Sequence, residues 1–227
     1  MYKKLAVAVA CLAAFATAQS AVVVSGAINE VLDRSGARIG STIDRWYFTV
    51  NSAGVVSMDV LSWEADAEDR VTADGIEERV EVLNNARIAF MDSHVHLFGD
   101  DGALDLADHI TENDDDFSNT YGDGSIYGYD SFLSLNLAAG NYVLVIGSYY
   151  LASTTALGSV NLGTFYPTTC TTAGVDCDYA PTSSADYQIT FTGDVNMRGG
   201  ITVPEPAPLA LLGAALAALA LRRRCNG

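Results

Sequence analysis

The feature that most constrains the fold is a long succession of short β-prone runs, each bounded by turn-forming residues. Between residues 21 and 191, runs rich in valine, isoleucine, tyrosine and phenylalanine are separated by clusters of glycine, asparagine, aspartate and serine. Many short strands with turn signals between them are typical of a β-sandwich, whereas strands alternating with long helical patterns would indicate an α/β fold. The sequence therefore predicts an all-β, antiparallel β-sandwich over residues 21–195.

The strand-like runs also predict local connections. They are AVVVSGAI, RWYFTVNSAGVVSMDVLSW, ARIAFMDSHVHLF, DSFLSLNLAAGNYVLVIGSYY and ADYQITFTGDV. The second and fourth runs each hold a turn signal, at 51–54 and 138–141, flanked by alternating apolar residues, and each therefore predicts a β-hairpin. Residues 64–87 break the pattern and are interpreted as an insertion, in which apolar residues at helical spacing over 76–83 predict a short helix.

The first 20 residues predict an export signal that signal peptidase removes. Lys3 and Lys4 form a short basic region, residues 5–15 are apolar, and Ala16 and Ala18 are the small residues that cleavage requires. Acylation at Cys11 is the less favoured alternative, because the apolar stretch before that cysteine is too short.

The C-terminal end has the composition of a membrane anchor. Residues 196–206 are rich in glycine and proline and predict a linker. An alanine- and leucine-rich segment follows over 207–221, about 22 Å long as a helix, and precedes a basic tail over 222–227. Basic residues after an apolar segment favour retention on the cytoplasmic side, so this segment predicts a short transmembrane helix rather than a buried core helix.

The order of these C-terminal features resembles the PEP-CTERM sorting signal of Gram-negative bacteria. The resemblance is carried by the sorting motif Val203, Pro204, Glu205 and Pro206, by the apolar segment, and by the membrane-stop arginines. These arginines are Arg222, Arg223 and Arg224. The resemblance implies an exported protein that an exosortase-type membrane protease processes near the motif, with a transient inner-membrane anchor and delivery to the cell surface or the extracellular matrix.

A second resemblance concerns the middle of the chain. The segments WYFTVNSAGVVSMDVLSW, HVHLFGDDGALDLADHITENDDD, YDSFLSLNLAAGNYVLVIGSY and ADYQITFTG follow the order seen in DVUA0089-type PEP-CTERM proteins. Those proteins are similar to bacterial pre-peptidase C-terminal (PPC-like) domains. The resemblance implies a jelly-roll-like sandwich without known catalysis, and the chain departs from it at residues 64–87.

The charge of the central segment disfavours nucleic acid as a partner. Five of the 12 basic residues and one of the 28 acidic residues lie in the two ends, so residues 21–203 hold seven positive and 27 negative charges, a formal net charge of −20. Such a surface repels phosphate backbones, but it attracts divalent cations and keeps an exported protein soluble.

The cysteines agree with export. Cys11 and Cys225 lie in the two ends, and Cys170 and Cys177 remain in the central segment. An oxidising compartment allows this pair to form a disulfide around a small loop, and the spacing does not fit a CxxC redox motif.

The densest acidic stretch, around residues 99–130, could hold structural calcium as a cofactor. Carboxylates on loops can supply the six to eight oxygen ligands that calcium takes, although the spacing is not that of an EF-hand. The predicted ligands are Asp114, Asp115, Asp116, Asp123 and Asp130. The competing interpretation, favoured here, is that these carboxylates are solvated turn residues.

The segment DSHVH suggests a second kind of metal site. Side chains repeat every two residues along a strand, so Asp92, His94 and His96 share one face and could bind zinc or another transition metal. The competing interpretation, favoured here, is that all three face water while Val95 and Leu97 face the core.

The sequence gives no indication of an enzyme. It contains no HExxH, GxSxG or GxxxxGK[ST] motif. The prediction is thus a non-enzymatic surface or matrix protein. The alternative is a carbohydrate-binding module for exopolysaccharide that stacks sugars on Trp46, Trp63, Tyr149 and Tyr150.

Overall fold

The computed structural model describes residues 21–62, 89–116, 129–163, 168–170 and 179–198. The strands in these ranges are β1 (Val22–Leu32), β2 (Arg38–Thr42), β3 (Asp44–Val50), β4 (Gly54–Leu61), β5 (Ala89–Phe90), β6 (Ser93–Gly99), β7 (His109–Asn113), β8 (Phe132–Leu137), β9 (Gly140–Ser148), β10 (Val160–Leu162), β11 (Thr168–Cys170), β12 (Tyr179–Pro181), β13 (Ser184–Thr192) and β14 (Val195–Met197). Two short helical turns accompany them, η1 (Leu106–Asp108) and α1 (Ser153–Ala156).

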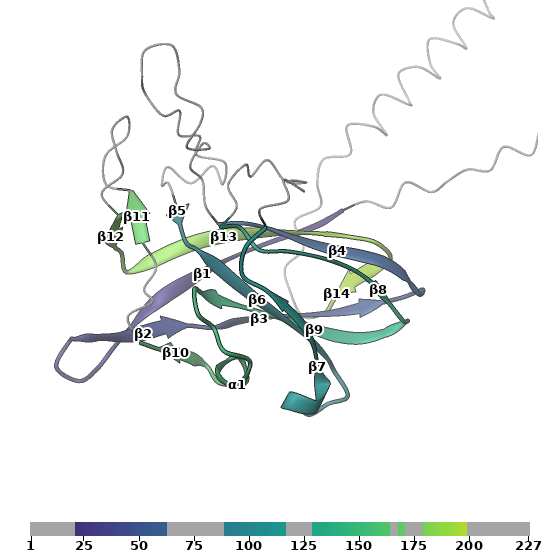
Figure 1. The fold of residues 1–227 in the computed structure, drawn as a ribbon, viewed down its shortest axis with the longest axis horizontal. Coiled ribbons are helices and arrows are strands. Elements are labelled where there is room, and N and C mark those ends of the chain that lie inside the picture. Colours follow the sequence, from purple (N-terminus) through teal and green to yellow (C-terminus); the bar gives the residue numbers. More distant parts are fainter. Residues whose placement is uncertain (1–20, 63–88, 117–128, 164–167, 171–178, 199–227) are drawn as a thin grey trace, which may run out of the picture.

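The strands form two large sheets that pack face to face (Figure 1). One sheet has the order β10-β2-β1-β13-β4-β8 and the other the order β14-β3-β9-β6-β7, while β12-β11-β5 make a small third sheet. Every pairing between the described strands is antiparallel. The prediction of an all-β antiparallel sandwich is therefore confirmed.

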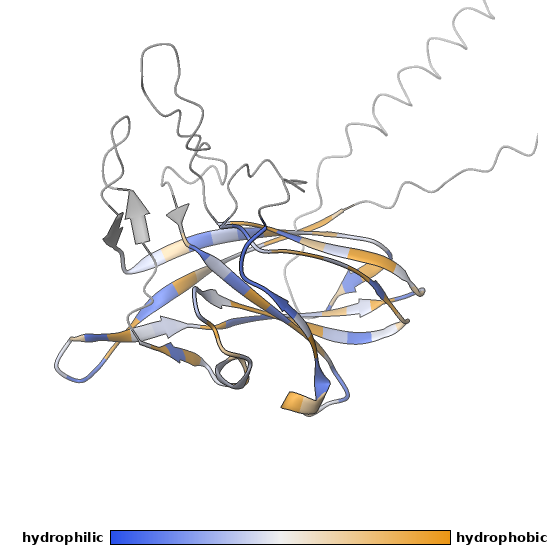
Figure 2. Cartoon of the chain, in the orientation of Figure 1, coloured by the Kyte–Doolittle hydropathy of each residue, from blue (hydrophilic) through white to orange (hydrophobic). Residues whose placement is uncertain are grey.

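The core lies between the two large sheets and is built by strict alternation. In β13, buried residues alternate with half-buried ones, so Tyr187, Ile189 and Phe191 all point inward. They meet residues of the opposite sheet such as Phe48, whose ring centroid is 5.2 Å from that of Phe191. Figure 2 shows the resulting alternation of hydrophilic and hydrophobic residues along the strands.

Both predicted hairpins are wrong, because each pair of strands crosses from one sheet to the other. β3 lies in the five-stranded sheet beside β9, whereas β4 lies in the six-stranded sheet beside β13 and β8. The connection from β8 to β9 crosses in the same way. A tight turn between two alternating runs can join neighbouring strands of one sheet or strands of the two facing sheets. In both arrangements the apolar faces of the two strands point into the same core.

A second, smaller core covers the outer face of the five-stranded sheet. Residues 149–158, which include α1, fold back over β9 and β6, and Leu151 and Ala156 become fully buried against Val143 and Val145. Gly147 makes room for this return, because a Cβ there would lie 3.1 Å from a Leu151 methyl group. The sheet is thus buried on both faces around these residues.

Several predicted features lie outside the described residues. They are the signal peptide over 1–20, the insertion over 64–87 with its short helix, the transmembrane segment over 207–221 and the basic tail. Within the described ranges, the helices are too short to cross a membrane.

Candidate functional site

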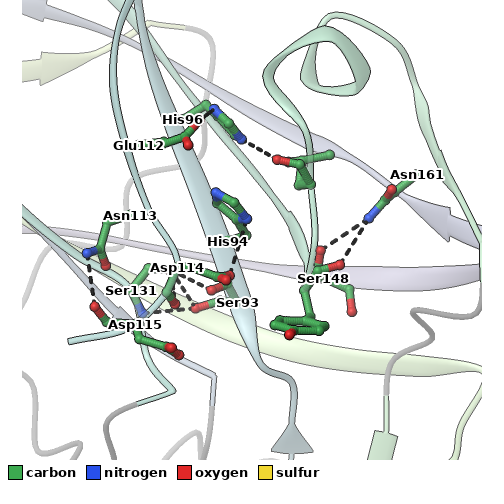
Figure 3. A network of polar contacts seen from close by, with 12 residues as sticks. Ser93, His94, His96, Glu112, Asn113, Asp114, Asp115, Ser131, Ser148 and Asn161 are labelled. Atoms are coloured by element: carbon green, nitrogen blue, oxygen red, sulfur yellow. Dashed lines mark hydrogen bonds and ion pairs between the residues drawn. The ribbon is translucent and has the colours of Figure 1, made fainter. Parts of the chain in front are cut away.

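The candidate site lies on the outer face of the five-stranded sheet, where β6 runs between β9 and the edge strand β7. Because side chains alternate along a strand, Val95 and Leu97 enter the central core while His94 and His96 point to the opposite side. Figure 3 shows these two imidazoles near the carboxylates of Glu112 and Asp114. A polar cluster therefore occupies a face that is otherwise apolar.

His96 is fully buried in this cluster. The interpretation that Asp92, His94 and His96 all face water is wrong for this residue, because residues 149–158 cover it. The Nε2 atom of His96 is hydrogen-bonded to the carbonyl oxygen of Leu151 in that covering segment. Burial lowers the pKa of His96 to about 4, so its ring is neutral near pH 7.

The other ring nitrogen of His96 faces the edge strand. His96 and Glu112 are directly opposite each other in the β6–β7 ladder, and His96 Nδ1 lies 3.0 Å from Glu112 Oε2. His109 Nε2 is 3.1 Å from the same Nδ1 and 3.7 Å from Glu112 Oε2. Three potential metal-binding groups thus converge on one point.

His94 stacks on His96 with ring centroids 4.6 Å apart and an interplanar angle of 14°. Its Nδ1 atom is 3.2 Å from Asp114 Oδ1, and burial lowers its pKa. Both ring nitrogens are buried, and within the described residues neither makes a hydrogen bond. A buried imidazole without such partners is unusual and requires an explanation.

Carboxylates crowd the other end of the cluster. Burial raises the pKa of Asp92 to about 8, and the charges of Asp114, Asp115 and Asp130 raise it further in the same direction. Burial also raises the pKa values of Asp114 and Asp115. The Oδ1 atoms of Asp92, Asp114 and Asp115 are buried and make no hydrogen bond within the part of the chain that is described. A bound cation would relieve this repulsion.

The structure brings together most of the predicted calcium ligands. Asp114, Asp115 and Asp116 follow β7, and Asp130 precedes β8 at 4% exposure. Asp130 Oδ1 accepts hydrogen bonds from the Ser62 backbone N–H (2.7 Å) and the Ser62 hydroxyl (2.8 Å). The fifth predicted ligand, Asp123, lies outside the described residues.

A cavity of about 310 Å³ opens beside His94. It is lined by His94, Glu112, Asp114, Tyr150, Leu151, Ala152 and Ser153. Tyr150 is 63% exposed and has a positive φ of 61°, a conformation that non-glycine residues rarely adopt. Of the other predicted sugar-stacking residues, Tyr149 is exposed, Trp46 packs partly against the core, and Trp63 lies outside the described residues.

The sequence does not predict the place of two residues in this site. Glu112 belongs to no motif, and Asp92, which strand alternation places with the histidines of DSHVH, lies among the carboxylates. The short connection from β6 to β7, nine residues over 100–108, was the available signal for Glu112, because short connections favour antiparallel neighbours.

Residues 202–224 match the family model of the PEP-CTERM protein-sorting motif. The predicted sorting motif is confirmed by this match, which indicates an exported protein that is sorted by an exosortase through a transient membrane anchor. No curated protein matches the chain.

Solved structures that are similar to this chain include the following two. One is the pre-peptidase C-terminal domain of collagenase from Bacillus anthracis, at 10% identity and a TM-score of 0.34, over 76% of this chain and 90% of that one. The other is PliG, a periplasmic inhibitor of g-type lysozyme from Aeromonas hydrophila, at 9% identity and a TM-score of 0.33, over 80% and 91% of the two chains. In this chain, the PEP-CTERM sorting motif lies C-terminal to an all-β sandwich.

Proposed function

We propose that the protein is a non-enzymatic component of the cell surface or extracellular matrix of a Gram-negative bacterium. The observation that carries this proposal is the PEP-CTERM motif over 202–224. In this proposal, signal peptidase removes residues 1–20 and exosortase cleaves near Val203–Pro206. The product is the acidic sandwich, which retains seven arginines and 27 acidic residues over 21–203. Its negative charge keeps it soluble and attracts cations from the matrix.

Blocking the sorting motif in the native host tests this proposal. Replacing Pro204, Glu205 and Pro206 together by alanine removes the extended backbone and the charge of the motif. The expected result is an uncleaved protein that stays in the membrane fraction. The control Ile201→Ala, just upstream of the match, should be processed like the wild type. Release of the triple variant at the wild-type mass and level would overturn the proposal.

We propose carbohydrate binding as a second candidate function, favoured by the exposed Tyr150 at the rim of the cavity. Its ring offers a stacking face, and the neighbouring carboxylates of Glu112 and Asp114 accept hydrogen bonds from sugar hydroxyls. Affinity electrophoresis in gels that contain the host exopolysaccharide tests it. The wild type should be retarded and Tyr150→Ala should not, while Tyr47→Ala, an exposed tyrosine on β3, serves as control. Equal migration with and without the polysaccharide would exclude this function.

We also propose that calcium binds at the carboxylate cluster, with Asp92, Asp114, Asp115 and Asp130 as the main ligands. The support is the buried Oδ1 atoms of Asp92, Asp114 and Asp115, which make no hydrogen bond within the described residues, the charge of Asp130 beside Asp92, and the oxygen preference of calcium. Calcium should raise the melting temperature relative to a chelator, and Asp115→Asn should reduce that rise. Identical melting under both conditions would exclude the site.

Two finer assignments remain part of the proposal. One is that the sandwich is a jelly-roll-like, PPC-like domain of DVUA0089 type, for which the strand connections that cross between the two sheets are the support. The other is a disulfide between Cys170 at the end of β11 and Cys177, which lies outside the described residues. Export to an oxidising compartment supports the disulfide, and thiol titration of the unfolded protein tests it.

A further inference from the structure

The cluster at His94, His96 and Glu112 has the dimensions of a transition-metal site. One ligand atom from each of these residues can be chosen so that all three lie within 4.8 Å of one another. Ligand atoms around a tetrahedral zinc ion, each ~2.0–2.2 Å from the metal, are roughly 3.4 Å apart. Small side-chain rotations therefore bring the three groups to coordination distance.

The hydrogen bonds of His96 leave a lone pair directed at a carboxylate. Leu151 O can only accept, so His96 Nε2 carries the ring proton that this bond requires. In a neutral ring, Nδ1 is then an acceptor, and it lies 3.0 Å from Glu112 Oε2, which is also an acceptor. Two acceptors at this distance repel each other unless a donor or a cation lies beside both. His109 Nε2, 3.1 Å from His96 Nδ1 and 3.7 Å from Glu112 Oε2, can donate one hydrogen bond there, and a metal cation bound by His96 and Glu112 takes the place of that hydrogen bond.

His94 gives a second and independent observation. Both of its ring nitrogens are buried, and among the described residues they form no hydrogen bond. Its side chain is 12% exposed, and it borders the cavity that also touches Glu112. A metal bond to one of these nitrogens would supply a stronger partner than the Asp114 carboxylate, whose Oδ1 lies 3.2 Å from Nδ1 without forming a hydrogen bond.

We propose that His94, His96 and Glu112 bind one divalent transition-metal ion, with zinc as the preferred metal. The cavity beside His94 gives the ion access and leaves room for a water molecule or the Asp114 carboxylate as a fourth ligand. The site stands on its own evidence and does not depend on the sorting of the protein.

The donor set selects zinc over calcium. Two imidazole nitrogens and one carboxylate oxygen suit zinc and related metals, whereas calcium takes oxygen ligands almost exclusively. The hydrogen bond from His96 Nε2 to Leu151 O is also the kind of outer contact that fixes the tautomer and ring orientation of a metal-binding histidine. The metal would thus tie β6 to the edge strand β7, beneath the covering segment over 149–158.

Competition for zinc against a chromophoric chelator tests the proposal on the full chain in detergent. The wild type should bind one zinc per chain at this site, and cobalt in its place should give the visible absorption of a low-symmetry nitrogen and oxygen site. Glu112→Gln and His94→Gln should each weaken zinc binding by at least about 10- to 100-fold, the range that loss of even an outer-shell partner produces. Both residues are partly exposed, so the variants should fold, which circular dichroism checks.

Two controls separate this site from other causes. Glu30→Gln makes the same charge change on β1, at an ion pair with Arg38, and should leave zinc affinity unchanged. Asp115→Asn should weaken calcium binding but keep zinc binding, so failure of the calcium proposal can be distinguished from failure of the zinc proposal. Zinc bound equally by the wild type, Glu112→Gln and His94→Gln would place the metal elsewhere, on the cysteines for example, and would overturn the inference. Absence of zinc binding by the wild type would overturn it as well.

Discussion

Replacing Tyr187 by phenylalanine should destabilise the sandwich measurably without changing its packing. Tyr187 is fully buried, and its hydroxyl joins the two sheets: it accepts a hydrogen bond from Trp46 Nε1 (2.9 Å) and donates one to Asp44 Oδ2 (2.7 Å). Gly26, its neighbour on β1, provides the necessary room, because a Cβ there would overlap the hydroxyl. Phenylalanine keeps the ring in place and removes only the oxygen.

The magnitude follows from the two lost hydrogen bonds. A neutral hydrogen bond contributes about 1 kcal/mol, and one to a charged group about 1.5–3 kcal/mol. Trp46 is only partly buried and can recover some hydration, so the free energy of unfolding should fall by about 2–3 kcal/mol. For a domain of this size, that loss lowers the melting temperature by roughly 5–10 °C.

Urea denaturation followed by far-ultraviolet circular dichroism measures this difference. The slope of the transition should stay constant, because the surface exposed on unfolding does not change. Tyr47→Phe on β3 is the matched control: this ring is 38% exposed, and phenylalanine preserves its contact with the Arg198 guanidinium. It should change the stability by less than about 0.5 kcal/mol. A Tyr187→Phe variant as stable as this control would refute the idea that the hydroxyl links the sheets.

Three further perturbations test other parts of the structure. Burial raises the pKa of Asp44 above its unfolded value. The free energy of unfolding of the wild type should therefore fall relative to that of Asp44→Asn as the pH rises through the folded pKa. The same pH dependence of unfolding for both proteins between pH 3 and 7 would contradict this. Gly193 has a φ of +105°, and a Cβ there would lie 2.7 Å from Val55 O. Gly193→Ala should therefore lower the free energy of unfolding by more than about 1 kcal/mol. An unchanged melting temperature would count against this backbone geometry. Leu151→Ala should cost about 2–5 kcal/mol in chemical denaturation and increase hydrogen–deuterium exchange around His96, and unaltered exchange would show that the covering segment does not protect the site.

The positions of the strands could be predicted from the sequence, but their partners could not. Alternation in ADYQITFTGDV defines the inward face of β13, because one face of a sandwich sheet must be buried. The same alternation does not say whether the next strand lies in the same sheet. That choice depends on long-range pairing such as β3 with β9, whose partners are about 100 residues apart.

The candidate site was only partly predictable for a related reason. The spacing of His94 and His96 correctly placed them on one face, but nothing local indicated that residues 149–158 would cover that face. Asp92 and Asp130 are 38 positions apart, and they interact only because β6 and the start of β8 are brought together by the fold. Burial and cross-strand register are set by tertiary structure. The proposed role of Glu112 as a metal ligand therefore becomes visible only when the β6–β7 ladder places it opposite His96.

The central claim is that both apolar ends direct the protein to its destination and that the acidic sandwich is the lasting product. The most direct measurement is the intact mass of the protein recovered from the cell surface and the medium of its host. The account predicts a single product that begins near residue 19–21 and ends near Val203–Pro206. Recovery of the untrimmed 24.0 kDa chain from those fractions would contradict it.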